Sequence, residues 1–343
     1  MWKSLVSAAA LVFVTMQPAA SAEITLRLHQ FLPPQAPIPA NFLEPWIEKV
    51  EQESGGRIEI QHYPAMQLGG SPASLYEQVR DGVVDLIWTL PGYTPGVFPK
   101  SETFELPFMT KSSQASSQAL WEFYEKHLVD EFDDVHVITM HTHGPGLLHV
   151  KGDPVETLED MQGLKLRGPT RVISSLLSEL GAMAVGMPVP SVPESLSKGV
   201  IDGAVVPWEV TRSIRLAELT DAHTSFGGDA GLYTATFLFA MNKARFEALP
   251  DDLKAVIDAN SGLEAARWAG RVMDEGDAPG LAAAKEQGNT LVEISAADAE
   301  AWKQAAQPVV DHWIEEMDGL GFDGAALLED ARALITKYDT AAQ

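Results

Sequence analysis

Helix-like and strand-like patterns alternate along nearly the whole chain, and this alternation limits the possible fold more than any other feature. Short apolar or β-branched runs, which favour strands, occur at 24–28, 58–63, 83–88, 135–140, 164–167, 182–185, 204–206 and 233–242. Stretches that favour helices occur at 41–54, 71–80, 114–129, 172–180, 192–198, 251–285, 295–319 and 324–337. This order predicts a layered α/β fold.

One short pattern occurs twice. Arg80-Asp81-Gly82-Val83-Val84-Asp85 resembles Ser197-Lys198-Gly199-Val200-Ile201-Asp202. Each segment has a helix end with a basic residue, a glycine near the C-cap, two β-branched residues and an aspartate. Coincidence at a common helix-to-strand junction is the alternative, and if the repeat is real it indicates two lobes of similar build.

The N-terminal segment predicts an export signal. Met1-Trp2-Lys3 precedes an apolar run from Leu5 to Met16, and Ala20-Ser21-Ala22 follows. The run is too short to span a bilayer, and the small residues match a signal-peptidase site. We therefore expect residues 1–22 to be a signal peptide that is cleaved after about Ala22, so that the mature protein lies in the periplasm and is not membrane-embedded.

Charge and cysteine content exclude several classes of protein. The chain has a formal net charge of −24 and no cysteine. Strong negative charge disfavours nucleic acid and anionic membranes as partners. Without cysteine there is no disulfide, no thiol chemistry and no lipid attached to a thiol. An anionic ligand would need a local cationic site.

The segment from Gly163 to Thr170 contains the best candidate for such a site. A short predicted strand ends in Arg167, and Gly168-Pro169 makes a bend before a predicted helix start at Thr170. Arginine keeps its charge, and its planar fork binds a carboxylate through two parallel hydrogen bonds. Strand ends in open α/β sheets are common ligand sites. An ordinary surface salt bridge is the other interpretation of this residue.

No catalytic motif is found, so the catalytic residues, the metal and the cofactors are each predicted to be none. The chain lacks H-E-x-x-H, G-x-S-x-G and G-x-x-x-x-G-K-[ST]. His141 and His143 face the same side of a predicted strand and could meet one ion, but no third ligand follows at a telling spacing. Packed or hydrogen-bonded histidines are the better interpretation of this pair.

Aromatic residues gather near the predicted strand ends. Phe31, Trp88, Tyr93 and Trp208 all lie at or just after a strand. Any one of them is best explained as core. Together they could line a cleft opposite Arg167.

These residues, in this order, resemble the extracytoplasmic solute-binding proteins of tripartite ATP-independent periplasmic (TRAP) transporters. The resemblance extends from about Ile24 to about Lys337. It rests on the segments Pro64 to Gly69, Gln78 to Asp85, Phe104 to Phe108, Gly163 to Arg167 and Gly199 to Pro207.

The resemblance implies two α/β lobes joined by a hinge with a long helix, with a ligand enclosed between the lobes. We expect residues 23–146 and about 235–275 in lobe I, and residues 147–234 and about 276–337 in lobe II. It also implies that Arg167 binds the ligand carboxylate. The membrane subunits of a cation-coupled TRAP transporter are the implied partners.

Departures from the sialic-acid binders of the family indicate a less polar ligand. Leu90 lies near the place of their glutamate, Val206 near that of an asparagine, and Phe31 or Leu32 near that of a second asparagine. Their second arginine has no counterpart between Gly146 and His149. A sugar acid would leave its hydroxyls unpaired in such a site, at about 1–3 kcal/mol each. We therefore predict a monocarboxylate with an aromatic or apolar body.

The secondary contacts and the alternatives stay open at this point. Pocket-lining candidates are Phe31, Trp88, Leu90, Tyr93, Val206 and Trp208, with His29 and Gln30 as further polar candidates. The ligand could instead be an aliphatic 2-oxo or hydroxy acid, or a sugar acid. More distant alternatives are an exported metal-dependent enzyme that uses His141 and His143, and a secreted interaction protein with a vestigial cleft.

Overall fold

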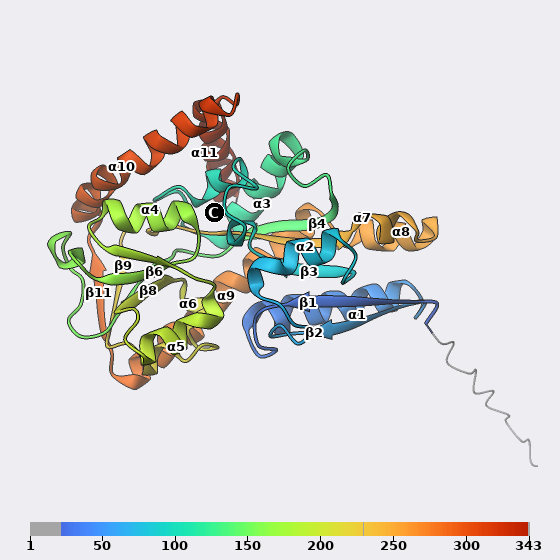
Figure 1. The fold of residues 1–343 in the computed structure, drawn as a ribbon, viewed down its shortest axis with the longest axis horizontal. Helices are drawn as coiled ribbons and strands as arrows, with labels where there is room; N and C mark the ends of the chain where they lie inside the picture. The colour runs from blue at the N-terminus through green and yellow to red at the C-terminus, as the bar shows by residue number, and fades with distance from the viewer. Residues whose placement is uncertain (1–21, 229, 342–343) are drawn as a thin grey trace, which may run out of the picture.

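The computed structural model describes residues 22–228 and 230–341, and its strands form two separate sheets (Figure 1). The predicted signal peptide therefore lies almost entirely outside the described residues. Each sheet has helices packed against it, as the alternating pattern requires. The α/β, two-lobe fold expected from the sequence is confirmed.

The first sheet has the strand order β2-β1-β3-β10-β4. Strands β1, β2 and β3 are parallel, whereas β10 runs antiparallel to both β3 and β4. The chain therefore returns to this sheet after building most of the second one. The bounds are β1 Ile24–Gln30, β2 Ile58–Tyr63, β3 Leu86–Thr89, β4 Val135–Thr142 and β10 Thr236–Asn242, with α1 Glu44–Glu53, α2 Leu75–Arg80 and α3 Ser113–Phe123 packed on the sheet.

The second sheet has the strand order β11-β9-β5-β8-β6-β7. Strand β6 is parallel to β7 and β8, and β5 is antiparallel to β8 and β9. The bounds of the strands are β5 Leu147–Val150, β6 Lys165–Gly168, β7 Met183–Gly186, β8 Gly203–Val206, β9 Ala222–Phe226 and β11 Thr290–Ile294. Three helices alternate with these strands along the chain: α4 Arg171–Glu179 after β6, α5 Val192–Ser197 after β7, and α6 Trp208–Thr211 after β8.

Long helices connect the two lobes. Helix α9, Leu263–Gln287, packs against α3 and β4 at one part and against α6 at another, so it runs from one lobe to the other (Figure 1). Helix α10, Ala296–Gly319, packs on α4, and α11, Gly324–Ala341, packs on α3. The two short helices before α9 are α7 Lys243–Glu247 and α8 Asp251–Ala259.

The structure corrects several predicted elements. The predicted strand 83–88 begins only at Leu86, because the exposed Val83 still belongs to the turn. The predicted helix 251–285 is two helices, since Gly262 has a φ of 82° that interrupts the helix. Strands β5, β9 and β11 were not predicted.

Candidate ligand-binding site

A cavity lies where residues from the two sheets face one another. Its empty space, including the part that is open to solvent, is about 370 Å³. Most of its lining is aromatic or aliphatic, and the polar lining residues come from several separate segments. The lining residues are Phe31, Leu32, Trp88, Leu90, Tyr93, His143, Arg167, Pro169, Val189, Val206, Pro207, Glu209, Val210, Tyr233, Ala235 and Phe237.

Arg167 lines this cavity from the second sheet, near the C-terminal end of β6. Its residue is 2% exposed. Nε donates to the carbonyl oxygen of Met187 at 2.8 Å, and Nη1 donates to that of Val205 at 3.1 Å. Among the described residues no carboxylate lies within 4.0 Å of this guanidinium. A buried cation that is held in place but has no counter-ion is a strong site for an anion.

Stacked aromatic rings form the opposite wall, on the first sheet. The ring centroids of Phe31 and Trp88 are 4.9 Å apart, and those of Trp88 and Phe237 are also 4.9 Å apart. Tyr93 meets Phe31 edge-on at 5.6 Å. Leu90 also lies on this wall. These surfaces suit a flat apolar group, because ring pairs gain energy beyond simple area burial.

His141 and His143, the pair considered as metal ligands, are both buried and hydrogen-bonded. His141 Nε2 accepts from Trp88 Nε1 at 2.8 Å, and Nδ1 donates to the carbonyl oxygen of Thr142 at 3.1 Å. Burial lowers the pKa of His141 to about 4 and that of His143 to about 3. His141 thus has no nitrogen free for a metal. Within the described ranges no group of three or more His, Cys, Asp or Glu side chains could hold a metal ion.

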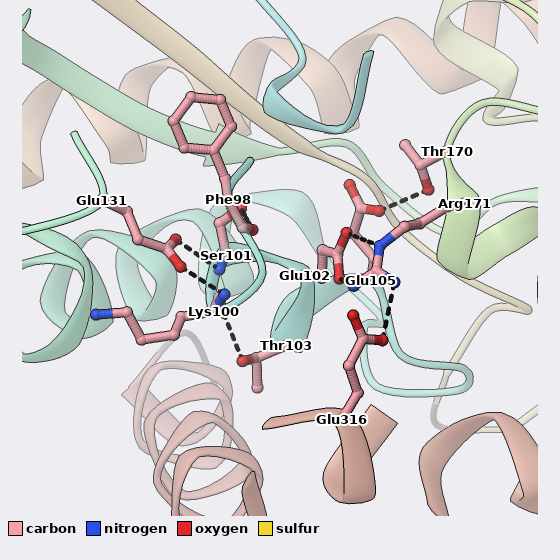
Figure 2. A network of polar contacts seen from close by, with 10 residues as sticks. All are labelled: Phe98, Lys100, Ser101, Glu102, Thr103, Glu105, Glu131, Thr170, Arg171 and Glu316. Atoms are coloured by element: carbon pink, nitrogen blue, oxygen red, sulfur yellow. Dashed lines mark hydrogen bonds and ion pairs between the residues drawn. The ribbon is translucent and has the colours of Figure 1, made fainter. Parts of the chain in front are cut away.

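Polar contacts connect the two sides of the cavity. The Tyr93 hydroxyl, beyond β3, accepts from the backbone N–H of Val189, beyond β7, at 3.1 Å. The Thr170 hydroxyl donates to Glu105 Oε2 at 2.6 Å, as Figure 2 shows. Burial raises the pKa of Glu105 to about 7. These bonds hold the first residues of α4 against the segment that precedes α3.

An arginine beside this contact strengthens the same junction. Arg171 Nε and Nη2 each donate to one oxygen of Glu102 at 2.5 Å, and Nη1 donates to Glu316 of α10 at 2.8 Å (Figure 2). Glu102 is 4% exposed, and burial raises its pKa despite this partner. The bidentate geometry fixes the start of α4, which directly follows the Arg167 strand.

Glu209 is a cavity residue that the sequence analysis missed. It is 4% exposed, and its Oε2 has no hydrogen-bond partner among the described residues. Burial, with a smaller effect of Asp277, raises its pKa to about 8. Only its position two residues after Pro207 could have pointed to this residue in the sequence, and that does not single out one glutamate among 48 acidic residues.

Three predicted site residues lie elsewhere. Trp208 is not among the residues that line the cavity, because α6 begins at this residue and its ring packs on His149 at 5.1 Å. His29 Nδ1 contacts Gln78 Oε1 at 2.7 Å, and Gln30 Nε2 donates to the carbonyl oxygen of Leu32 at 2.9 Å. Both side chains fix loops rather than face the cavity.

Comparison with known proteins gives a family match and several similar solved structures. The family described as bacterial extracellular solute-binding protein, family 7, matches residues 29–316. None of the helices in the described part of the chain is both long and apolar enough to cross a bilayer.

Three solved structures are similar over nearly their full length. A TRAP solute-binding protein from Rhodoferax ferrireducens T118, with copurified benzoate, is 51% identical, has a TM-score of 0.91, and is matched over 93% of this chain and 99% of its own. A marine metagenome TRAP protein described as specific for aromatic acid ligands, with 3-hydroxybenzoate, is 48% identical and has a TM-score of 0.91. The match covers 93% of this chain and 100% of that protein. A Bordetella bronchiseptica TRAP protein with bound (R)- and (S)-mandelate is 31% identical and has a TM-score of 0.85. The match covers 91% of this chain and 99% of that protein.

Proposed function

Because the chain belongs to family 7 of the bacterial extracellular solute-binding proteins, the TRAP solute-binding proteins, we propose that it captures a small aromatic monocarboxylate. The observation that carries this proposal is the buried Arg167, which has no carboxylate partner among the described residues and faces a wall of stacked rings. The ligand carboxylate supplies the missing counter-charge, and the ring packs against Phe31 and Trp88.

The solved relatives support the aromatic ligand. The proteins that were crystallised with benzoate, 3-hydroxybenzoate and mandelate are 51%, 48% and 31% identical to this chain. Each of these molecules joins one carboxylate to one ring. An aliphatic 2-oxo or hydroxy acid would pair with Arg167 but gain less from the rings. A sugar acid fits less well, because the cavity has few polar groups to receive its hydroxyls.

Delivery of the ligand to the membrane subunits of a TRAP transporter completes the proposal. The protein works in the periplasm after removal of residues 1–22, and the remaining chain forms the two lobes with the bounds expected above, except that α11 is assigned to lobe I because it packs on α3. We propose binding without a chemical reaction. An enzyme that used His141 and His143 would need free imidazole nitrogens, and both nitrogens of His141 are hydrogen-bonded.

A thermal-shift screen of the mature protein against carboxylates tests this function. The panel contains benzoates, phenylacetates, indole acids, 2-oxo acids, dicarboxylates and sugar acids. A ligand at about 1,000 times its Kd should stabilise the protein by about 4 kcal/mol. We expect the shift with aromatic monocarboxylates, and a shift with sugar acids alone would contradict the proposed ligand. A stable protein partner without any small ligand would instead favour an interaction protein.

A further inference from the structure

Glu209 occupies a position between the ligand cavity and the long helix α9. It follows β8 and lies in the first turn of α6. The residue lines the cavity that contains Arg167, and it also borders a second hollow on the α9 side. Glu209 is thus a buried residue shared by the proposed ligand site and the second hollow.

The backbone holds Glu209 firmly in this place. Its N–H donates to Asp277 Oδ1 of α9 at 2.9 Å. A Cβ atom on Gly276 would lie 2.8 Å from the Cβ of Glu209, so only glycine lets the helix pack this closely. The Cα and Cβ of Glu209 are therefore held beside the cavity by the packing of α6 on α9.

One oxygen of this carboxyl group has an unmet hydrogen-bonding capacity. Glu209 Oε2 has no partner among the described residues, and the residue is 4% exposed. Leaving a buried polar atom unpaired costs stability, so such an atom in a binding cavity calls for an explanation. Much of the neighbouring lining is apolar, including Val206, Pro207 and Val210.

The protonation state of Glu209 suits a neutral polar group rather than a second charge. Burial raises its pKa to about 8, so at neutral pH the group is mostly a carboxylic acid. A protonated carboxyl group can both donate and accept a hydrogen bond. It does not repel an anionic ligand whose own carboxylate is bound by Arg167.

We propose that Glu209 is a specificity-determining residue that binds a hydroxyl group on the ring of the aromatic acid. This inference rests on the proposed function, since Arg167 must hold the carboxylate for the ring to reach Glu209. A hydroxyl at a suitable ring position completes the hydrogen bonding of Oε2. A methyl group of similar size at that position cannot do so.

Isothermal titration calorimetry with matched ligands tests this role on the wild-type protein. The ligands are benzoate, its three monohydroxy derivatives and the three methylbenzoates. We expect one hydroxybenzoate to bind about 10- to 100-fold more tightly than the methylbenzoate of the same pattern. If no hydroxy isomer binds more tightly than its methyl counterpart, the role of Glu209 is refuted even though aromatic acids bind.

Variants separate recognition from a structural effect. Glu209→Met keeps the length of the side chain, and it should abolish the hydroxyl preference, so that the affinity for the preferred hydroxybenzoate falls about 10- to 100-fold further than the affinity for benzoate. Glu209→Gln keeps a donor and an acceptor and should retain most of the preference. Glu131→Gln removes a half-buried carboxyl group, whose oxygens accept from the backbone N–H groups of Lys100 and Ser101 (Figure 2), and should leave the preference intact.

The outcomes distinguish the two levels of the proposal. An equal loss of benzoate and hydroxybenzoate binding in Glu209→Met would show a structural role and overturn the inference alone. If wild-type protein binds no aromatic carboxylate at all, the proposed function fails and the inference fails with it. If Glu209→Met does not fold, the wild-type ratio of hydroxy to methyl ligands still decides.

Discussion

Replacing Arg167 by methionine tests the central electrostatic argument. Methionine is similar in length to the arginine stem but has no charge and no donors. Two charge-assisted hydrogen bonds to a ligand carboxylate contribute about 1.5–3 kcal/mol each, so their loss weakens binding by about 3–6 kcal/mol. This range corresponds to an increase of roughly 150- to 25,000-fold in Kd.

The ligand-free protein should respond much less to the same change. Arg167 loses hydrogen bonds to two carbonyl oxygens, but the cost of burying an unpaired guanidinium disappears as well. Because these effects oppose each other, we expect the free energy of unfolding to fall by no more than about 2 kcal/mol. Urea unfolding without ligand and calorimetry with the best aromatic acid from the screen measure the two effects separately.

Two further variants make the result interpretable. Arg167→Lys keeps the charge but not the planar fork, so it should recover only part of the affinity. Arg212 is an exposed arginine that borders the neighbouring hollow, and Arg212→Met should change the affinity by less than about threefold because solvent screens its charge. An affinity of Arg167→Met within tenfold of wild type would refute the carboxylate role.

Three other perturbations test packing, the α4 junction and buried ionisation. Gly280→Ala should lower the free energy of unfolding by about 1–3 kcal/mol, because the new Cβ would lie 2.1 Å from a backbone oxygen of α6. Gly319→Ala is the control: its Cβ meets nothing within 4 Å, so the free energy of unfolding measured in urea should rise by about 0.5–1 kcal/mol. Arg171→Ala leaves the buried carboxyl group of Glu102 unpaired and should lower the free energy of unfolding by about 3–5 kcal/mol. Glu316→Gln removes only the more exposed partner and should lower it by about 1 kcal/mol or less, so equal melting temperatures of the two variants would contradict this reasoning. Burial raises the pKa of Glu209 from 4.5 to about 8, so the folded protein holds a proton that the unfolded chain releases. The free energy of unfolding should therefore fall as pH rises from about 5 to 8, and Glu209→Gln should make that slope shallower; an unchanged slope would argue against a neutral carboxyl group.

The features that could be predicted from the sequence are those that depend on neighbouring residues. Arg167 stands out because a strand, a bend and a helix start follow one another within a few residues. Phe31, Trp88 and Tyr93 could be grouped because each lies at or just after a predicted strand, and the structure brings them together because β1 and β3 are adjacent parallel strands. The α/β alternation likewise follows from local periodicity.

Other cavity residues depend on contacts that no local pattern reveals. Tyr233 and Phe237 reach the cavity because β10 returns to the first sheet, and Gly146 leaves room for the Tyr233 ring, which a Cβ would approach to 2.2 Å. Glu209 is set by its contact with α9, which follows it by more than 50 residues. Trp208 was grouped with the cleft because it follows a strand, but the helix that starts there carries its ring to His149.

The division of the site between the two sheets connects ligand binding to closure. The charge that needs a partner, Arg167, belongs to the second sheet, whereas the stacked rings belong to the first. A molecule that carries only a carboxylate can pair with Arg167, and one that carries only a ring can pack on the aromatic wall, whereas an aromatic acid can contact both sheets. Contacts such as Tyr93 with Val189 and Arg171 with Glu102 join the two sides without a ligand. Under the proposed function, the ligand shifts the protein toward the closed state by its difference in affinity between the closed and open states, and pairing with Arg167 contributes to that difference.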